Sequence, residues 1–84
     1  MKPWFVYIVE CSDGTLYTGI TVDVKARLKA HNEGLGAKYT KPRRPVKLWY
    51  TEKHFGRSKA TKRERVIKKL SRAQKLRLIG YEEK

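Results

Sequence analysis

Residues 4–20, with the sequence WFVYIVECSDGTLYTGI, carry the clearest structural signal in the chain. Residues 4–10 are mostly β-branched and aromatic, and their apolar side chains fall on both alternating faces. This pattern predicts a β-strand that is covered on both sides. Ser12-Asp13-Gly14 is typical of a turn, so we predict that residues 15–20 return as a second, antiparallel strand.

The length of this turn determines how Tyr7 and Tyr17 lie relative to each other. A two-residue turn centred on Asp13 and Gly14 would place the tyrosines on opposite faces, because side chains alternate along a strand. A three-residue loop with Gly14 in the left-handed conformation would place them on one face as diagonal neighbours. Glycine at the third loop position favours the three-residue loop.

The middle of the chain predicts a helix, a loop and a strand. Thr21 is expected to cap a helix that runs to about Asn32 and is stopped by Gly34. Residues 34–45 form a basic loop that is rich in glycine and interrupted by proline. Residues 46–53 alternate as expected of a third, half-exposed strand, with Val46, Leu48 and Tyr50 set against Lys47, Trp49 and Thr51.

The last third of the chain predicts two helices. Ser58 is expected to cap the first of them, whose apolar stripe is Ala60, Val66, Ile67 and Leu70 and whose opposite face is Lys62, Arg65, Lys68 and Lys69. Residues 71–74 match a capping box and predict a short final helix that ends before Gly80. The order β-β-α-β-α-α predicts an α+β fold, a small three-stranded antiparallel sheet flanked by helices, in a single domain over residues 1–84.

The charge distribution indicates a polyanionic partner. The chain has 21 Lys and Arg against 8 Asp and Glu, a net charge of +13, and residues 1–33 are neutral overall, so residues 34–84 carry the whole excess. Such a surface attracts nucleic acid. The alternative is a solvated basic surface that only maintains solubility. A membrane-surface helix is disfavoured, because no broad face of Trp, Phe and Leu lies opposite the basic residues.

Cysteine usage and the N-terminal segment bear on the compartment. Cys11 is the only cysteine, so the sequence excludes an internal disulfide and a Cys-rich zinc site. This fits a reducing compartment, and we expect a cytoplasmic protein. The apolar run from Pro3 to Val9 is short and is followed by Glu10. It is therefore typical of a strand rather than a signal peptide or a membrane span.

Two spacings suggest a catalytic site, each with a structural alternative. Arg27 and His31 are four residues apart on the first predicted helix, so they share a face on which they could hold a phosphate and transfer a proton. Asp23, four residues before Arg27, offers a surface salt bridge instead. Tyr7 and Tyr17 could orient water and phosphate oxygens, but aromatic residues in strands more often pack a core.

Glu64 is an unusual acid for its surroundings. Between residues 34 and 81 it shares a strongly basic segment with only one other acid, Glu52. A carboxylate there would repel a phosphate unless it held a divalent cation that the phosphate also binds. The alternative is a helical salt bridge from Glu64 to Lys68.

Taken together, these residues resemble the pattern of the GIY-YIG endonucleases. Val6-Tyr7-Ile8 and Tyr17-Thr18-Gly19 stand where that family has its two strand motifs, followed by Arg27, His31 and a helical Glu64. Residues 34–40, GLGAKYT, and 69–76, KLSRAQKL, are similar to the small stand-alone bacterial subgroup of the family. The first motif lacks the family's usual glycine. The late asparagine of many members is also missing, with Leu76 near its position and Gln74 the nearest amide.

The resemblance implies a divalent-metal-dependent endonuclease that hydrolyses phosphodiester bonds in DNA, in repair or recombination. It implies that Tyr7 and Tyr17 flank the attacking water and the phosphate, and that Arg27 stabilises phosphoryl charge. His31 would assist deprotonation, and Glu64 would bind one Mg²⁺ or Mn²⁺ ion. For nucleic-acid binding we name the basic loop and helix residues with one tyrosine: Lys38, Tyr39, Arg43, Arg44, Lys62, Arg65, Lys68, Lys69 and Arg72.

Two other functions fit the same sequence. The first is a non-catalytic DNA- or RNA-binding module that retains the nuclease fold, because basic residues and Tyr39 serve binding and catalysis equally. The second is a subunit that takes its target specificity from a protein partner, since a chain of this length leaves little room for a target-reading domain. The presence of Tyr7, Tyr17, Arg27 and Glu64 together favours the enzyme.

Overall fold

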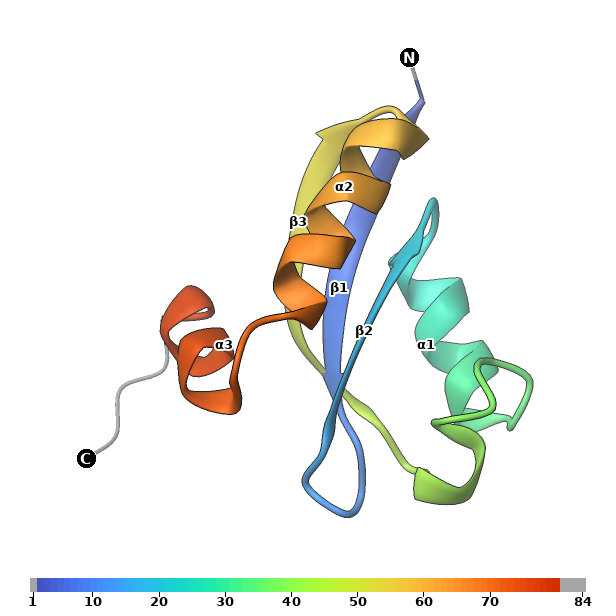
Figure 1. Ribbon diagram of the computed structural model, residues 1–84. Helices are drawn as coiled ribbons and strands as arrows, with labels where there is room; N and C mark the ends of the chain where they lie inside the picture. The colour runs from blue at the N-terminus through green and yellow to red at the C-terminus, as the bar shows by residue number, and fades with distance from the viewer. Residues whose placement is uncertain (1, 81–84) are drawn as a thin grey trace.

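The computed structural model describes residues 2–80, and its element order is the predicted β-β-α-β-α-α. The strands are β1 (Pro3–Glu10), β2 (Leu16–Thr21) and β3 (Lys47–Phe55), and the helices are α1 (Val24–Asn32), α2 (Arg57–Lys68) and α3 (Arg72–Leu78). A 3₁₀ turn, η1 (Lys41–Arg43), lies in the loop before β3 (Figure 1). The predicted single domain over residues 1–84 includes residue 1 and residues 81–84, which lie outside the described residues. No helix within residues 2–80 is long and apolar enough to cross a membrane.

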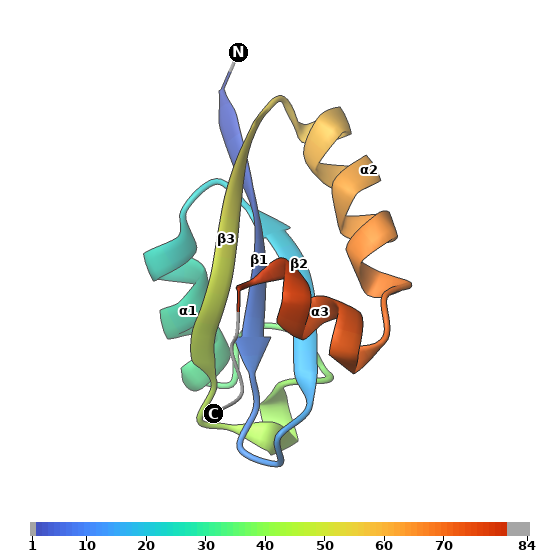
Figure 2. The same ribbon diagram turned by 90° about the vertical axis from the view of Figure 1, so that its left-hand side faces the viewer.

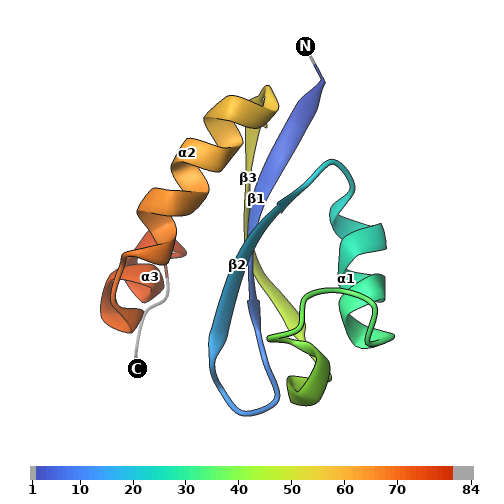
Figure 3. The same cartoon turned by 45° about the vertical axis from the view of Figure 1, so that its right-hand side comes forward.

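The sheet is antiparallel throughout and has the order β2-β1-β3. The strand β1 is therefore central, and helices cover both of its faces, as its apolar sequence predicts. Seen along the sheet, α1 lies on one side and α2 on the other (Figure 2), and α3 lies on the same side as α2 (Figure 3). The strand β2 forms an edge, and α1 and α2 flank it (Figure 3).

The core is divided by the sheet into two clusters. Val6 and Ile8 point to the α2 side and pack with Ala60 and Ile67, all of them fully buried. The alternate residues of β1 point to the α1 side, where Tyr7, Val9, Cys11 and Val46 pack with Tyr17 and Leu28. Because successive side chains of a strand alternate, β1 supplies both clusters and places Tyr7 on the α1 side.

The β1–β2 connection is the predicted three-residue loop. The Cys11 N–H donates to the Thr15 carbonyl (2.8 Å) and the Gly14 N–H donates to the Cys11 carbonyl (2.9 Å). Gly14 has φ of 83°, the left-handed conformation that glycine adopts without strain. The register pairs Tyr7 with Gly19 and Val9 with Tyr17, so both tyrosines lie on one face as diagonal neighbours.

The first helix start differs from its prediction. The N-cap of α1 is Asp23, whose carboxylate accepts a hydrogen bond from the Ala26 N–H (3.0 Å). The Thr21 hydroxyl instead accepts from the Asp23 N–H and so supports the turn before the helix. Asp23 caps the helix rather than Thr21, because Asp23 lies three residues before a backbone N–H that has no partner in the helix, and a capping carboxylate spans this distance.

The start of α2 is also different. The helix begins at Arg57, after Gly56 with φ of 105°, and Ser58 makes no capping hydrogen bond. Val66 of the predicted apolar stripe is 51% exposed, whereas Ala60 and Ile67 are fully buried. The predicted capping box is confirmed, with Ser71 and Gln74 bonded reciprocally at the start of α3.

A β-bulge changes the predicted alternation of the third strand. The pairing with β1 shifts between Ile8 and Val9, so that Val9 faces Leu48 while Ile8 faces Tyr50. Trp49 is the extra residue, and both Trp49 and Tyr50 pack against the α2-side cluster. Val46 packs on the α1 side, so the predicted face of Val46, Leu48 and Tyr50 is split.

Candidate active site

A hydrogen-bonded cluster joins β1 to α1. The Tyr7 hydroxyl lies 2.8 Å from Nε2 of His31 and accepts a hydrogen bond from Nε of Arg27 at 3.3 Å. His31 is completely buried and Tyr7 is 2% exposed. The alternative partner of Arg27, Asp23, caps the helix, and no salt bridge joins the two within residues 2–80. The helical spacing of Arg27 and His31 therefore directs both toward one tyrosine.

Thr40 determines where the protons of this cluster lie. Its hydroxyl donates to the Ala37 carbonyl (3.0 Å) and lies 2.7 Å from Nδ1 of His31. A hydroxyl has one hydrogen, so Thr40 accepts from the imidazole, and Nδ1 carries the proton. The Ala37 N–H, at 3.5 Å from Nδ1, is too distant to compete. The lone pair on Nε2 then faces Tyr7, whose hydroxyl donates to it.

Burial controls the protonation of both partners. It lowers the pKa of His31, and the positive charge of Arg27 lowers it further. It raises the pKa of Tyr7, while the hydrogen bond and charge of Arg27 act in the opposite direction. The resting state at neutral pH is therefore a neutral imidazole beside a neutral phenol. Arg27 would favour the phenolate if His31 took the proton.

Two glycines make room for this cluster. A Cβ on Gly19 would lie 2.6 Å from the Tyr7 hydroxyl oxygen, and one on Gly36 would lie 2.2 Å from Nδ1 of His31. Both distances are far below contact, so a side chain at either position would displace the ring. Gly19 lets the Tyr7 ring cross β2, and Gly36 lets the loop close over the imidazole.

Tyr17 stands beside the cluster and connects it to the basic loop. Its ring centroid lies 5.5 Å from that of His31 and 6.5 Å from that of Tyr7. The ring also stacks on Tyr39 at 6.0 Å and 21°. The Arg43 guanidinium lies 4.0 Å from the Tyr39 ring centroid. Tyr17 and Tyr39 therefore form a continuous aromatic surface beside the buried histidine.

Glu64 projects from α2 near the β2 edge. Its side chain is 17% exposed and pairs with Lys68 at 3.4 Å, which is the salt bridge considered as the alternative. Its negative charge also contributes to the raised pKa of Tyr7, so the carboxylate and the hydroxyl lie within electrostatic reach. Glu64 is thus both a helical ion-pair partner and a neighbour of the tyrosine cluster.

The donor set around Glu64 fits a cation with few protein ligands. No group of three or more His, Cys, Asp and Glu side chains that could hold a metal occurs in the described part of the chain. A single carboxylate offers the hard oxygen that Mg²⁺ or Mn²⁺ prefers, and Mg²⁺ usually retains water and takes phosphate oxygens as ligands. The arrangement therefore fits an ion shared with a substrate rather than a closed structural site.

Of the nine residues named for nucleic-acid binding, Tyr39 stacks on Tyr17 and Lys68 pairs with Glu64, and the other seven fall into two groups. Lys38, Lys62, Arg65 and Lys69 are exposed and form no salt bridge within residues 2–80. The three arginines of the other group have internal partners. Arg43 donates to Asp13 (3.0 Å) and the Tyr39 carbonyl (2.7 Å), and Arg72 donates to the Gly14 carbonyl (2.6 Å).

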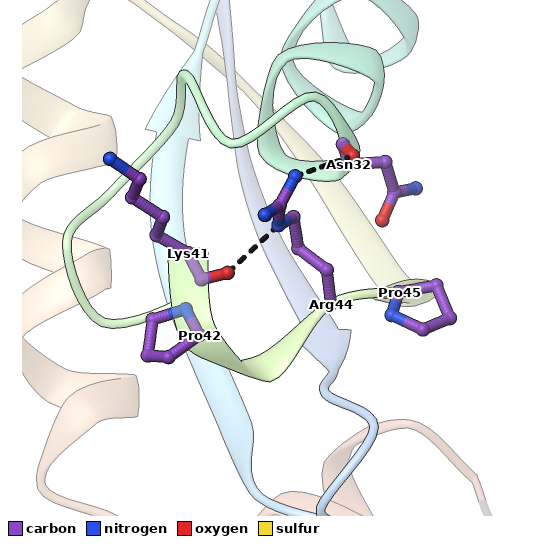
Figure 4. Close-up of a pocket in the computed structure, with 5 residues that line it drawn as sticks. All are labelled: Asn32, Lys41, Pro42, Arg44 and Pro45. Carbon is purple, nitrogen blue, oxygen red and sulfur yellow. Dashed lines mark hydrogen bonds between the residues drawn. The ribbon is translucent and has the colours of Figure 1, made fainter.

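Arg44 is the clearest case of an internal role. It lines a pocket of about 490 Å³ with Asn32, Lys41, Pro42 and Pro45 (Figure 4). Its guanidinium points inward and donates to the carbonyls of Lys41 (2.8 Å) and Asn32 (3.5 Å). Arg44 thereby holds the basic loop against the C-terminal end of α1, and fewer of its N–H groups remain to bind a ligand.

Sequence reasoning overlooked three residues. Thr40 and Gly36 lie within a segment that resembles the bacterial subgroup, but only the fold shows that they surround His31. Lys75 lies beside Gln74, the amide considered for the late asparagine. Gln74 is exposed and its amide oxygen accepts from the Ser71 N–H (2.9 Å), whereas Lys75 is half-buried near Tyr17.

The chain matches a known family. Residues 3–77 match the family described as the GIY-YIG catalytic domain, and the chain therefore belongs to the GIY-YIG family. It is similar to small bacterial proteins named UPF0213. One from Staphylococcus aureus (strain Mu3) is 60% identical over 79 residues, which are 94% of this chain and 96% of the relative.

Two structures determined by solution NMR are similar to this fold. The UPF0213 protein of Bacillus halodurans is 44% identical, with a TM-score of 0.60 and coverage of 93% of this chain and 83% of that chain. A protein from E. faecalis is 45% identical, with a TM-score of 0.65 and coverage of 95% and 85%.

Proposed function

We propose that the protein is a divalent-metal-dependent endonuclease that hydrolyses phosphodiester bonds in DNA. The observation that carries the proposal is the buried contact of Tyr7 with His31 and Arg27, beside the lone carboxylate of Glu64. A binding module needs positive charge and aromatic surface, but it does not need a buried base bonded to a phenol. Membership of a family with a catalytic domain supports the same conclusion.

The proton path follows from the hydrogen bonds. The Tyr7 hydroxyl passes its proton to Nε2 of His31, and Thr40 accepts from Nδ1 and holds the ring in place. The phenolate, stabilised by Arg27, then accepts a proton from the attacking water. Tyr7 is only 2% exposed, so its proposed role is to accept a proton from water rather than to bind a strand of DNA.

The chemical step is the attack of that water oxygen on phosphorus. The new P–O bond forms as the ester P–O bond breaks, and the leaving oxygen takes a proton from solvent. His31 releases its proton to solvent, which restores the neutral imidazole. Arg27 opposes the charge that develops on the phosphoryl oxygens, and Tyr17 orients the phosphate. Glu64 would hold Mg²⁺ or Mn²⁺, which would supply further positive charge to the phosphate.

A nicking assay tests the proposal directly. Supercoiled plasmid and branched DNA duplexes would be incubated with the protein in Mg²⁺, in Mn²⁺ and in EDTA. We expect nicking that requires metal and that is lost in His31→Gln and Glu64→Gln variants. Fluorescence anisotropy in EDTA should show that both variants still bind duplex DNA. Tight binding with no cleavage in either metal would instead support the non-catalytic binding module.

A further inference from the structure

A second pocket opens beside the tyrosine cluster, where β2, the basic loop, α2 and α3 meet. Its volume is about 340 Å³, and it is lined by Leu16, Tyr17, Thr18, Tyr39, Lys68 and Lys75. We call it the lysine pocket. It shares the Tyr17 ring with the cluster around His31, so a ligand in the lysine pocket would lie next to the proposed reaction centre.

The charges of the lysine pocket favour an anion. Two ammonium groups line it, and within residues 2–80 no carboxylate does. Burial lowers the pKa of Lys75, and the nearby charge of Lys68 lowers it further. Lys75 forms no salt bridge within the described residues, and Lys68 pairs only with Glu64 there. An anion between the two lysines would remove their mutual repulsion.

The remaining wall of the lysine pocket fits a nucleotide. Tyr17 and Tyr39 present stacked rings, and Lys68 Nζ lies 6.0 Å from the Tyr17 ring centroid. Aromatic side chains of this kind stack on bases without regard to sequence. Thr18 is 3% exposed, and its hydroxyl has no hydrogen-bond partner within residues 2–80. The pocket thus combines positive charge, an aromatic surface and an unsatisfied polar group.

The ion pair of Glu64 with Lys68 connects the lysine pocket to the proposed metal site. Glu64 is the only carboxylate paired with Lys68 in the described part of the chain. A divalent cation held by Glu64 would neutralise that carboxylate and release the Lys68 ammonium for a phosphate. Lys75 has no ion-pair partner among residues 2–80, so no carboxylate of this part of the chain has to be displaced before Lys75 contacts an anion.

We propose that the lysine pocket binds the DNA phosphate adjacent to the one that is cut, with Lys75 as its main anion ligand and the neighbouring base against Tyr17 and Tyr39. This inference rests on the proposed endonuclease function, because it names a second substrate subsite of the same active site. It also assigns a role to the segment that lacks the family's late asparagine.

Binding can be tested without cleavage. Thymidine 3′,5′-bisphosphate would be titrated, in Ca²⁺ and in EDTA, into ¹⁵N-labelled protein, with thymidine as the phosphate-free control. We expect the bisphosphate to shift the amide resonances of Thr18, Tyr39 and Lys75. Lys75→Met should weaken its affinity about tenfold or more, as expected for the loss of a charge-assisted contact. Lys75→Arg should restore much of the affinity, and Lys53→Met, on the far strand β3, should have no effect.

A substrate with altered charge tests the link to cleavage. A neutral methylphosphonate would replace the phosphate on either side of the cut position, and single-turnover rates would be compared for the parent and Lys75→Met. If Lys75 contacts one of these phosphates, a methylphosphonate at that position should markedly slow cleavage by the parent. The same methylphosphonate should slow cleavage by Lys75→Met little further. Equal and additive losses at both positions would overturn the assignment.

These measurements separate the two proposals. Bisphosphate binding that depends on Lys75, in a protein that cuts no DNA, would support the lysine pocket as a nucleotide site and reject the nuclease. Cleavage by a Lys75→Met variant at the parental rate, with parental affinity for the bisphosphate, would reject the lysine pocket and leave the nuclease intact. Thermal melting of each variant shows whether a loss reflects misfolding.

Discussion

The Tyr7 ring crosses β2 at Gly19, so closely that a Cβ on residue 19 would lie 2.6 Å from the tyrosine hydroxyl oxygen. Because residue 19 has no side chain, Tyr7 of the central strand can cross β2 and reach Arg27 and His31. The glycine of the second strand motif is therefore required by the position of a tyrosine in the first.

Gly19→Ala should displace Tyr7 and break its hydrogen bonds. We expect a loss of stability of roughly 1–3 kcal/mol, as for other overpacked sites, together with loss of cleavage. Urea denaturation measures the first effect and a nicking assay the second. The matched background is Tyr7→Leu, in which the ring is absent. There Gly19→Ala should cost much less, and an equal cost in both backgrounds would show that the clash is not with Tyr7.

The two tyrosines should respond differently to loss of the hydroxyl. Tyr7→Phe leaves the buried Nε2 of His31 without its partner, so we expect destabilisation of about 1–3 kcal/mol. The Tyr17 hydroxyl makes no hydrogen bond within residues 2–80, so Tyr17→Phe should leave stability unchanged. Both variants should lose cleavage by roughly 10²-fold or more if each hydroxyl acts on water or phosphate. Single-turnover cleavage and thermal melting of both would show whether stability and activity separate in this way.

Buried neutral His31 makes stability depend on pH. Burial lowers its pKa in the folded state, so the stabilisation is complete above the ordinary value of about 6.5 and is lost as the pH falls toward the lowered value. The loss is at most about 1.4 kcal/mol per pH unit, for one proton. Tyr7, Tyr17, Arg27 and Thr40 surround the ring, and none is a carboxylate that could offset its charge.

Denaturation between pH 7.5 and 5 would measure this dependence against a His31→Gln variant. Gln does not titrate, so the variant should lose the part of the pH dependence that His31 contributes and should vary less with pH than the parent over the same range. Titration of Glu52 affects stability in a separate, more acidic pH range. Burial alone would raise its pKa, but hydrogen bonds from Arg63, Tyr50 and His54 hold it below the ordinary carboxyl value. A parent and a variant with parallel pH profiles would exclude His31 as the source.

Glu64→Gln should separate catalysis from binding and folding. Glu64 forms an i,i+4 ion pair with the exposed Lys68, and loss of such a pair changes stability by no more than about 0.5 kcal/mol. Cleavage in Mg²⁺ should disappear, and DNA binding should stay the same or strengthen, because one repulsive charge is removed. Glu33→Gln, at the exposed C-cap of α1, is the matched control and should cut as the parent does. Parental cleavage by Glu64→Gln at the same Mg²⁺ concentration would remove Glu64 from the site.

The salt dependence of DNA binding should come mainly from the exposed lysines that form no salt bridge within residues 2–80, which include Lys62 and Lys69, and less from the arginines that have internal partners. Each phosphate contact contributes about 0.9 to the log–log slope of affinity against salt for duplex DNA. Lys62→Glu and Lys69→Glu should each reduce that slope, measured by anisotropy in EDTA, with little change in stability. Arg44→Glu should also destabilise the protein, because its guanidinium holds the Lys41 and Asn32 carbonyls. An affinity that is indifferent to salt would contradict electrostatic binding altogether.

Much of the fold could be predicted because it depends on neighbouring residues. Gly14 at the third loop position predicted the hairpin register, and that register places Tyr7 and Tyr17 on one face. The capping box of Ser71 and Gln74 is equally local. The β3 bulge was not predictable from the sequence. The residues of β3 alternate regularly, and Trp49 becomes an extra residue only when β3 pairs with β1.

The sequence by itself determined the element order, the register of the first hairpin and the concentration of positive charge after residue 33, because periodicity, turn chemistry and composition act over short distances along the chain. Only the tertiary structure decided which side chains meet. His31 lies between Tyr7 and Thr40, and Lys75 lines one pocket with Tyr17, although these residues are far apart in sequence. Such contacts depend on how helices pack on a sheet, and packing is a property of the whole fold rather than of any one segment.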